Sequence, residues 1–315
     1  MGRTPTKRDL LSIADLQHDL IALLRRADAM KRARMHGELS ATRPGANLAM
    51  IFEKPSTRTR TSFEVAMNDL GGHALYLSPK DMQLGRGETI GDTAHVLSQY
   101  VDGIVYRAFR HADEVALAQG ASVPVINALD DREHPCQIVA DLLTLYERWG
   151  GRFSGKTLAY IGDGNNVLNS LLLGAAIVGL NIVSATPLQY RPPADLVAMA
   201  ETFARGSGSS VKFTEQPMDA AKRADALYTD VWVSMGDEAE KDAREAAFRG
   251  YQINAALVAA ASSDVWVLHD LPAHRGMEIT DDVMDGPRAA IWDQAQNRLH
   301  AQKAILEHFL APRPS

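Results

Sequence analysis

Strand-like and helix-like stretches alternate along almost the whole chain, and this rhythm restricts the possible fold more than any other feature. After a helical opening segment that contains Leu10 to Leu24, short apolar runs are followed repeatedly by longer stretches with apolar residues at helical spacing. Such alternation is typical of parallel sheets covered by helices. In the first half we expect strands at 47–52, 73–77, 103–107 and 123–127, and helices near 57–70, 89–100, 111–119 and 135–149.

A second run of the same kind begins after Gly150-Gly151, a dipeptide that interrupts regular structure. A chain of 315 residues is too long for one hydrophobic core and fits two domains of roughly 150 residues each. We predict two wound parallel-sheet α/β domains, residues 1–148 and 149–292, with the active site in the cleft between them. A C-terminal helix at about 293–312 is expected to join the first domain. The second half should contain a helix near 165–178 and strands at 157–161, 181–186, 210–214, 225–229 and 264–268.

The composition is that of an ordinary globular protein, with 46% hydrophobic and 23% charged residues. A formal net charge of −6 gives no reason to expect nucleic acid as a partner, so an anion site must be a local concentration of basic residues. The single cysteine, Cys136, excludes a disulfide framework and a thiolate zinc cluster. Because no run of about 18 apolar residues occurs, we expect a soluble, cytoplasmic protein without a membrane partner.

Residues 53–64 predict an anion site at the start of a helix. The apolar run 47–52 ends before Pro55, and Ser56 or Thr57 can cap the helix that follows. The first N–H groups of a helix lack intrahelical partners and carry partial positive charge, so they attract a phosphate. Arg58 adds a planar fork for phosphate oxygens. Taken alone, the segment fits equally well a capped surface helix whose arginines pair with the neighbouring glutamates.

Further polar residues follow the predicted strands of the first half. Arg107 closes one strand, and His134 and Gln137 lie between the next strand and its helix. In open α/β sheets, ligands bind beyond the carboxyl ends of the strands. Two arginines would neutralise a phosphate dianion, and the histidine and glutamine would donate to a neighbouring carbonyl oxygen. These groups suit an acyl phosphate. A lone histidine such as His134 is more often a capping or core residue.

The second half offers groups that suit a zwitterionic amino acid. Asn166 and Asn169 follow the strand 157–161, whereas Asp230 and Ser234 follow the strand 225–229. The Asp230 carboxylate would pair with an α-ammonium group, although aspartate and serine are also common in turns. The segment that contains Gly162 and Gly164 lacks the third glycine of a dinucleotide-binding fingerprint, and the acidic residue expected at the end of the next strand is also missing. A Rossmann dehydrogenase is therefore a weak alternative.

Five motifs together resemble the ornithine carbamoyltransferase family, from about residue 10 to residue 310. The first and third in chain order are shared with aspartate carbamoyltransferases, and the Ser-Met-Gly stretch is typical of the ornithine branch. The motifs are Ser-Thr-Arg-Thr-Arg at 56–60, Gln-Leu-Gly-Arg-Gly-Glu-Thr at 83–89, His-Pro-Cys-Gln at 134–137, Asp-Val-Trp-Val-Ser-Met-Gly at 230–236 and Leu-Pro-Ala-His-Arg-Gly at 271–276.

The resemblance implies a role for individual residues. Arg107, His134, Asp270 and Arg298 would act in catalysis, and Gln83 would reach the active site of a neighbouring subunit in a trimer. Asn166, Asp230, Ser234, Met235 and Asp270 would bind ornithine. Carbamoyl phosphate would be bound by Ser56, Thr57, Arg58, Thr59, Gln83, Arg107, His134, Gln137, Leu271 and Arg298. Members of the family use no metal or organic cofactor.

One position departs from the family pattern. Family members usually carry His-Cys-Leu-Pro where this chain has His-Asp-Leu-Pro at 269–272, and the cysteine contacts the reacting end of ornithine. The nucleophile must be the neutral δ-amine. A free alkylammonium group has a pKa of about 10.4, so most ornithine in water at neutral pH carries a protonated δ-amine. We consider three roles for Asp270: it binds the protonated amine tightly, it accepts the amine proton as a general base, or it is structural.

The sequence thus predicts an enzyme that converts carbamoyl phosphate and L-ornithine to L-citrulline and phosphate, in the direction of arginine biosynthesis or in the reverse catabolic direction. Placement and charge stabilisation should supply most of the rate. Two alternatives stay open. The enzyme transfers the carbamoyl group to another amine, such as aspartate, putrescine or an acylated ornithine, or the chain is a sensor that binds metabolites without turnover.

Overall fold

The computed structural model describes residues 7–39, 41–83, 87–234, 236 and 238–311. The chain forms two compact units. Unit 1 runs to Val139 and resumes at Arg298, and unit 2 comprises Ala140–Asn297. The division falls within two helices, α5 (Pro135–Arg148) and α12 (Ile291–Phe309), each of which contributes residues to both units.

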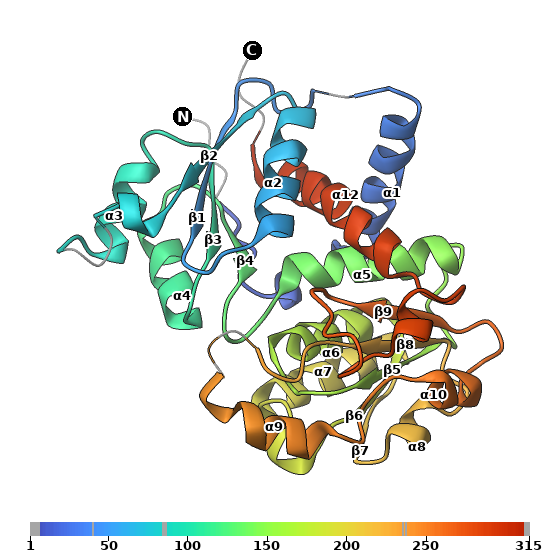
Figure 1. Ribbon diagram of the computed structural model, residues 1–315. Helices are drawn as coiled ribbons and strands as arrows, with labels where there is room; N and C mark the ends of the chain where they lie inside the picture. The colour runs from blue at the N-terminus through green and yellow to red at the C-terminus, as the bar shows by residue number, and fades with distance from the viewer. Residues whose placement is uncertain (1–6, 40, 84–86, 235, 237, 312–315) are drawn as a thin grey trace. The chain divides into compact units, whose positions relative to one another are not determined.

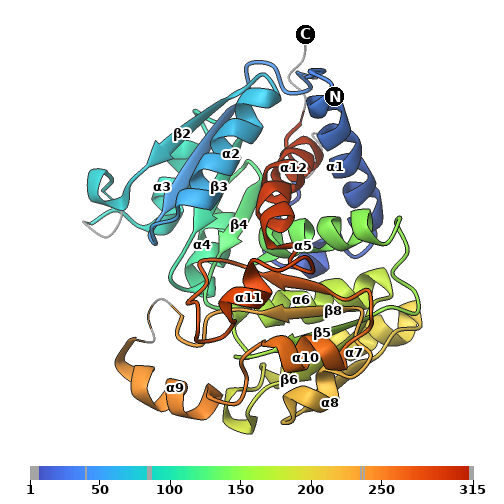
Figure 2. The same ribbon diagram turned by 45° about the vertical axis from the view of Figure 1, so that its right-hand side comes forward.

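Unit 1 is built on a parallel sheet with the strand order β2-β1-β3-β4. The strands are β1 (Asn47–Phe52), β2 (His73–Leu77), β3 (Gly103–Arg107) and β4 (Val125–Leu129). Strand β3 is buried throughout, as expected for a parallel strand covered on both faces. Figures 1 and 2 show helices on both sides of this sheet: α2 (Thr57–Asp69) covers one face, and α3 (Ile90–Leu97) and α4 (His111–Gly120) cover the other.

The predicted strands of unit 1 are largely confirmed. Strands β1, β2 and β3 have the predicted limits, whereas β4 begins and ends two residues later than predicted. Pro124 has no N–H to donate, and only its carbonyl oxygen joins the ladder, accepting from the Ile104 N–H at 2.9 Å. The opening segment is not one helix: a short 3-10 helix, Ile13–Leu16, precedes α1 (Leu20–Met35), and Ser12 caps it.

Unit 2 contains a second parallel sheet with the strand order β7-β6-β5-β8-β9. The order reverses at β5, since β6 and β7 lie on one side of it and β8 and β9 on the other. The carboxyl ends of β5 and β8 therefore flank the switch point, where ligands of open α/β sheets bind. The strands are β5 (Thr157–Ile161), β6 (Asn181–Ala185), β7 (Val211–Thr214), β8 (Ala226–Thr229) and β9 (Trp266–His269).

The strand β9 differs most from its prediction in this unit, because it spans 266–269 rather than 264–268. The chain is still turning at Val265, whose N–H donates to the Ser262 carbonyl oxygen at 3.0 Å. The remaining elements of the unit are α6 (Asn166–Val178), η3 (Leu188–Tyr190), α7 (Ala194–Ser207), α8 (Pro217–Ala221), η4 (Glu238–Glu240), α9 (Lys241–Phe248), α10 (Ala255–Ala260) and α11 (Asp281–Met284).

Aromatic packing in unit 2 fixes the segment that follows β8. The buried Phe248 ring lies 4.9 Å from Tyr190, 6.2 Å from Trp232 and 5.8 Å from Tyr251, measured between ring centroids. Edge-to-face and offset arrangements of this kind add to the burial of apolar area. The segment from Trp232 to Tyr251, which includes α9, is therefore anchored at both of its ends.

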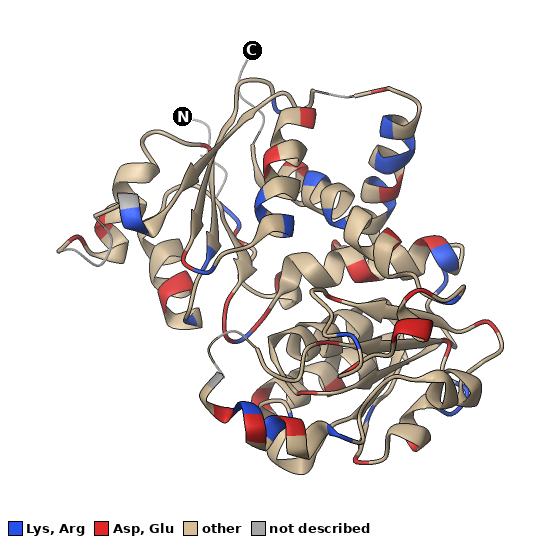
Figure 3. Cartoon of the chain, in the orientation of Figure 1, with Lys and Arg blue, Asp and Glu red and all other residues tan. Residues whose placement is uncertain are grey.

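Basic and acidic residues are intermixed on the surface of each unit. Figure 3 shows both kinds alternating along α9, where Lys241, Asp242, Arg244 and Glu245 occur within five positions. None of the described helices combines the length and the apolar character that a bilayer span requires.

Candidate active site

The start of α2 has the cap geometry that the sequence predicted. Ser56, rather than Thr57, is the N-cap residue, and its hydroxyl oxygen accepts from the Thr59 N–H at 3.2 Å. Thr59 is buried, Thr57 is exposed, and Arg58 is partly exposed at the first turn. The positive end of α2, whose first turn includes Arg58, therefore lies just beyond the carboxyl end of β1.

Arg107 comes to the same place from the neighbouring strand. Phe52 and Arg107 are register partners at the ends of β1 and β3, and the Glu53 N–H donates to the Arg107 carbonyl oxygen at 3.0 Å. The Arg107 side chain is 5% exposed. The Glu53 carboxylate, in contrast, accepts from the Tyr106 hydroxyl at 2.9 Å and from the Phe109 N–H at 2.7 Å.

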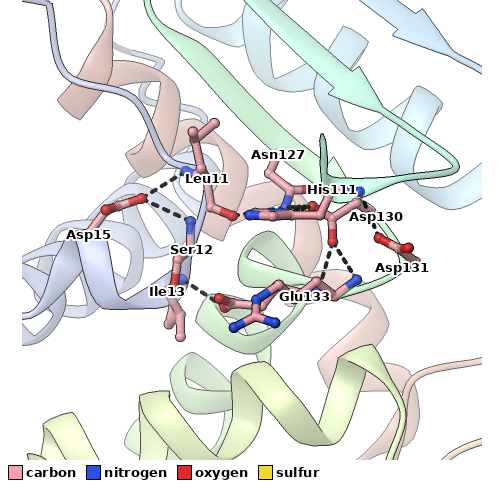
Figure 4. Close-up of polar contacts among 10 residues, drawn as sticks. Leu11, Ser12, Ile13, Asp15, His111, Asn127, Asp130, Asp131 and Glu133 are labelled. Carbon is pink, nitrogen blue, oxygen red and sulfur yellow. Dashed lines mark hydrogen bonds and ion pairs between the residues drawn. The ribbon is translucent and has the colours of Figure 1, made fainter. Parts of the chain in front are cut away.

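A network of hydrogen bonds orders the turn that leads from β4 to His134 (Figure 4). The Asp130 carboxylate accepts from the backbone N–H groups of Arg132 and Glu133, each at 2.7 Å, and from Asn127 Nδ2 at 2.9 Å. His111 at the start of α4 bonds the same carboxylate at 2.6 Å, and this hydrogen bond raises the pKa of His111. The turn is thus held to α4 and to the end of β4.

Arg298 joins three segments of unit 1 that are far apart in the sequence. Its guanidinium donates to Thr59 Oγ1 at 3.0 Å and to Gln137 Oε1, so α12 is tied to the first turns of α2 and α5. The side chain is buried, and its Nε has no hydrogen-bond partner among the described residues. A buried donor without a partner requires an explanation, and a bound ligand is one.

The electrostatics of this cluster keep its histidine neutral. Burial lowers the pKa of His134 well below its ordinary value, and the charges of Arg298, Arg107 and Arg58 lower it further. Burial also raises the pKa of the Cys136 thiol to about 12, and the thiol donates to the Asn127 carbonyl oxygen at 3.3 Å. Cys136 is therefore a protonated core residue, whereas His134 is a neutral group beside three cations.

The candidate residues of unit 2 lie at the carboxyl ends of β5 and β8. Asn165 caps α6, its Oδ1 accepting from the N–H groups of Val167 and Leu168 at 3.0 and 3.2 Å. Its Nδ2 donates to Asp230 Oδ2 at 2.7 Å, so the cap of α6 also orients the buried Asp230 carboxylate. Asn166 is the first residue of α6 and is partly exposed.

Asp230 and Asp270 occupy equivalent places on adjacent strands. Thr229 and His269 are register partners at the ends of β8 and β9, and each aspartate is the next residue of its strand. Burial and the Asp270 charge raise the pKa of Asp230 to about 7. Two carboxylates in this arrangement cannot both ionise as readily as isolated ones. The Asp270 charge therefore favours the protonated form of the Asp230 carboxyl group.

The remaining predicted residues are distributed as follows. Ser234 and Leu271 are half-buried, and Leu271 has a positive φ of 66° directly after Asp270. Gln83 is exposed and directly precedes residues 84–86, which are not among the described residues. Met235 lies outside the described residues.

Sequence reasoning missed two contacts that shape the site of unit 2. One is the Asn165 cap, for which an asparagine after a glycine-rich turn at a helix start was the available signal. The other is an ion pair between Arg244 of α9 and Asp163 at 2.8 Å, with the Arg244 guanidinium 4.9 Å from the Tyr190 ring centroid. It holds α9 against the turn after β5. No local pattern pairs two residues that are 81 positions apart.

Comparisons with known proteins cover almost the whole chain. Residues 8–147 match the model for the carbamoyl-P binding domain of aspartate/ornithine carbamoyltransferase, and residues 154–309 match the model for its Asp/Orn binding domain. The chain is 52% identical to a catabolic ornithine carbamoyltransferase of Thermoplasma volcanium over 97% of this chain and 99% of that protein.

Two further comparisons agree with these matches. An ornithine carbamoyltransferase of Methanoculleus marisnigri is 52% identical over 97% of each chain. The solved structure of the ornithine carbamoyltransferase from Pyrococcus furiosus superposes with a TM-score of 0.92 at 49% identity over 97% of each chain. The chain therefore belongs to the aspartate/ornithine carbamoyltransferase family.

Proposed function

We propose that this protein transfers the carbamoyl group of carbamoyl phosphate to the δ-nitrogen of L-ornithine, giving L-citrulline and phosphate. The observation that carries the proposal is the buried Arg298, whose guanidinium bridges Thr59 and Gln137 and keeps one N–H without a partner among the described residues. Family membership and the names of the relatives support the same activity.

Unit 1 supplies the carbamoyl phosphate site in this proposal. The N–H groups at the start of α2, with Ser56, Thr57 and Arg58, bind the phosphate together with Arg107. Arg298 and the neutral His134 donate to the carbamoyl oxygen, where negative charge develops during attack. Because His134 is neutral, it acts as a hydrogen-bond donor and not as a cation. Thr59 and Gln137 hold the Arg298 guanidinium in place.

Unit 2 supplies the amino acid site. Asp230 pairs with the α-ammonium group, and Asn166, Ser234 and Met235 bind the rest of the zwitterion. Asp270 lies at the reacting end of ornithine, and Leu271 contributes to the carbamoyl phosphate site. Gln83 acts on the active site of a neighbouring subunit, in a homotrimer or a multiple of trimers.

The reaction forms a C–N bond, breaks a C–O bond and transfers one proton. The lone pair of the neutral δ-nitrogen attacks the carbamoyl carbon, a C–N bond forms, and the C–O bond to phosphate breaks. The nitrogen loses one proton in this step, and the departing phosphate accepts it. A separate protein base is therefore not required for transfer, although the δ-ammonium group must lose a proton beforehand.

Asp270 is expected to influence that earlier deprotonation. A carboxylate stabilises the ammonium form and raises its pKa, so the rate optimum should lie at higher pH than with a thiol at this position. As a general base, Asp270 would instead produce a loss of rate when it is protonated at low pH. Comparing pH–rate profiles of the native protein and Asp270→Cys separates these roles, and superimposable profiles would assign Asp270 a structural role only.

A single assay tests the proposed function. Radiolabelled carbamoyl phosphate is incubated with L-ornithine, L-aspartate, putrescine or N-acetylornithine, and the labelled products are separated. We expect citrulline as the principal product. Efficient formation of carbamoylaspartate or carbamoylputrescine instead would reject ornithine as the acceptor, and binding of both substrates without product would indicate a sensor.

Putrescine is an alternative acceptor. Asp230 and Asp270 place two carboxylates on adjacent strand ends, which suits the two ammonium groups of putrescine and equally those of ornithine. Ornithine is preferred because the Ser-Met-Gly stretch is typical of the ornithine branch.

The reverse reaction should be assayed as well. Two of the similar proteins are named catabolic ornithine carbamoyltransferases, so we propose a second assay with citrulline and phosphate as substrates. We further propose a cytoplasmic location and a role in arginine metabolism.

A further inference from the structure

Leu271 has an unusual backbone conformation at the carboxyl end of β9. Its φ of 66° lies in the left-handed region, which a branched side chain seldom adopts. Such residues persist only where the surrounding structure holds them, and they gather at functional sites. Leu271 directly follows Asp270, whose charge acts on Asp230. The contacts that hold Leu271 therefore bear on the proposed ornithine site.

One hydrogen bond of Leu271 defines which ring nitrogen of a buried histidine carries the hydrogen. The Leu271 N–H donates to His269 Nδ1 at 2.8 Å, so Nδ1 is an acceptor and carries no hydrogen. The ring hydrogen must then be on Nε2. His269 Nε2 lies 3.0 Å from Glu278 Oε1, which accepts it. The neutral imidazole thus accepts a hydrogen bond from the Leu271 N–H and donates one to the Glu278 carboxylate.

Glu278 is itself firmly placed. Its Oε1 also accepts from the His274 N–H at 2.5 Å, and its carbonyl oxygen accepts from the Ile253 N–H at 2.8 Å. The side chains of His269 and Glu278 are both buried.

The backbone of His269 is also fixed. Its N–H donates to Gln294 Oε1 at 2.9 Å, and Gln294 Nε2 donates to Asp141 Oδ1 at 2.7 Å.

We propose that His269 and Glu278 are positioning residues for carbamoyl transfer: Glu278 selects the Nε2–H tautomer of His269, and that tautomer holds Leu271 and thereby the Asp270 side chain in the reactive geometry. Without the Glu278 acceptor, the ring hydrogen can move to Nδ1. Nδ1 would then face the Leu271 N–H as a second donor, and the turn would lose its conformation. This inference deepens the proposed function and rests on it.

Two substitutions of Glu278 test the proposal. Glu278→Leu removes both acceptor oxygens from the buried pair, whereas Glu278→Gln keeps one acceptor oxygen of the same reach without the charge. We expect Glu278→Leu to lower kcat about 100-fold, as small displacements of reacting groups do, with little change in the KM for carbamoyl phosphate. Glu278→Gln should stay within about threefold of the native kcat, because the selected tautomer is kept.

A spectroscopic measurement tests the tautomer without turnover. With nitrogen-15 histidine, the two ring nitrogens of His269 are identified by their loss in His269→Asn. We expect the Nε2–H pattern in the native protein and in Glu278→Gln. The Nδ1–H pattern or a protonated ring in the native protein would overturn the proposal, and this test applies even if Glu278→Leu does not fold.

A matched control separates positioning from general stability of the segment. Arg275 lies in the same stretch and pairs with Asp281 and Asp285 at 2.8 and 2.7 Å, and neither ion pair involves His269. Arg275→Ala should weaken the segment and leave kcat unchanged. A native kcat in folded Glu278→Leu, or an equal loss in Glu278→Gln, would contradict the inference. If the native protein makes no citrulline, the proposed function fails while the tautomer can still be measured.

Discussion

Asp230 is an aspartate whose surroundings favour the protonated carboxyl group. Burial and the neighbouring Asp270 raise its pKa to about 7, although Asn165 donates to it. The α-ammonium group of a ligand pairs with the ionised carboxylate. Below about pH 7, binding must therefore release the proton from Asp230. The affinity of the proposed ornithine site should therefore be controlled by this titration, independently of the reacting amine.

L-Norvaline isolates the effect, because it keeps the α-ammonium and α-carboxylate groups but lacks the δ-amine. We expect its affinity to rise as the pH increases through about 7 and to level off above, since Asp230 is then ionised. Calorimetric titrations between about pH 5.5 and pH 8.5 would measure this dependence. In Asp270→Asn the rise should move to lower pH, because one cause of the raised pKa is removed.

The control is the native protein in buffers of different ionisation enthalpy, which reveals the number of protons released on binding. Proton release should be found below about pH 7 and should disappear well above it. A pH-independent affinity, with no proton released, would contradict the assignment of Asp230 to the α-ammonium group.

At the scale of elements, the first turn of α2 combines a stabilising cap with a proposed phosphate site. Ser56→Ala removes the acceptor for the Thr59 N–H and should lower the free energy of unfolding by about 1 kcal/mol. The KM for carbamoyl phosphate should increase as well, because the helix start is no longer held. Urea unfolding and initial rates measure the two effects.

Asn254→Ala is the matched control for this cap. Asn254 caps α10 with two backbone contacts of 3.1 and 3.2 Å and is not assigned to the carbamoyl phosphate site. It should cost a similar amount of stability without a change in KM. If both variants change KM equally, or neither does, the start of α2 has no particular role in phosphate binding.

The pair of His111 and Asp130 links α4 to the turn before His134 (Figure 4). Because its hydrogen bond raises the pKa of His111, the pair stabilises the folded protein fully below the ordinary histidine pKa and loses this effect as the pH rises through the raised value. His111→Asn should therefore be less stable than the native protein by on the order of 1 kcal/mol at about pH 6.

Urea unfolding at several pH values would test this dependence. The difference in stability between the native protein and His111→Asn should shrink toward pH 9, because His111 of the native protein is then uncharged. A difference that grows with pH would show that the neutral ring, and not the ion pair, stabilises the turn.

At the scale of the whole molecule, the proposed trimer makes each active site depend on two subunits. Arg58→Ala and Gln83→Ala should each be nearly inactive alone, because one lacks a phosphate ligand and the other lacks the residue offered to the neighbour. After unfolding and refolding of an equal mixture, about a quarter of the sites should contain both native residues, since the two lesions lie on opposite sides of the interface.

Recovered activity near that fraction would support shared sites. The control is each variant refolded alone, which should stay inactive. No recovery in mixed trimers, verified by size-exclusion chromatography, would assign Gln83 to the site of its own subunit, and an active Gln83→Ala refolded alone would assign it to no site.

The sequence by itself determined the features that depend on local patterns. The alternation of apolar runs predicted parallel sheets, and β1, β2 and β3 have the predicted limits, since strand burial and chain-breaking residues act within a few positions. The cap at the start of α2 follows from the same local chemistry. Motifs at strand ends predicted the candidate residues, because parallel strands present their carboxyl ends at one edge.

Only the tertiary structure decided which distant residues meet. The Arg298 contacts with Thr59 and Gln137, the ion pair of Arg244 with Asp163, and the bridge from Leu271 through His269 to Glu278 all depend on how elements pack. Likewise, the register of β8 against β9 places Asp270 beside Asp230 and so raises the pKa of that carboxyl group. Side-chain contacts across long sequence separations are set by the packed core, which no local pattern encodes.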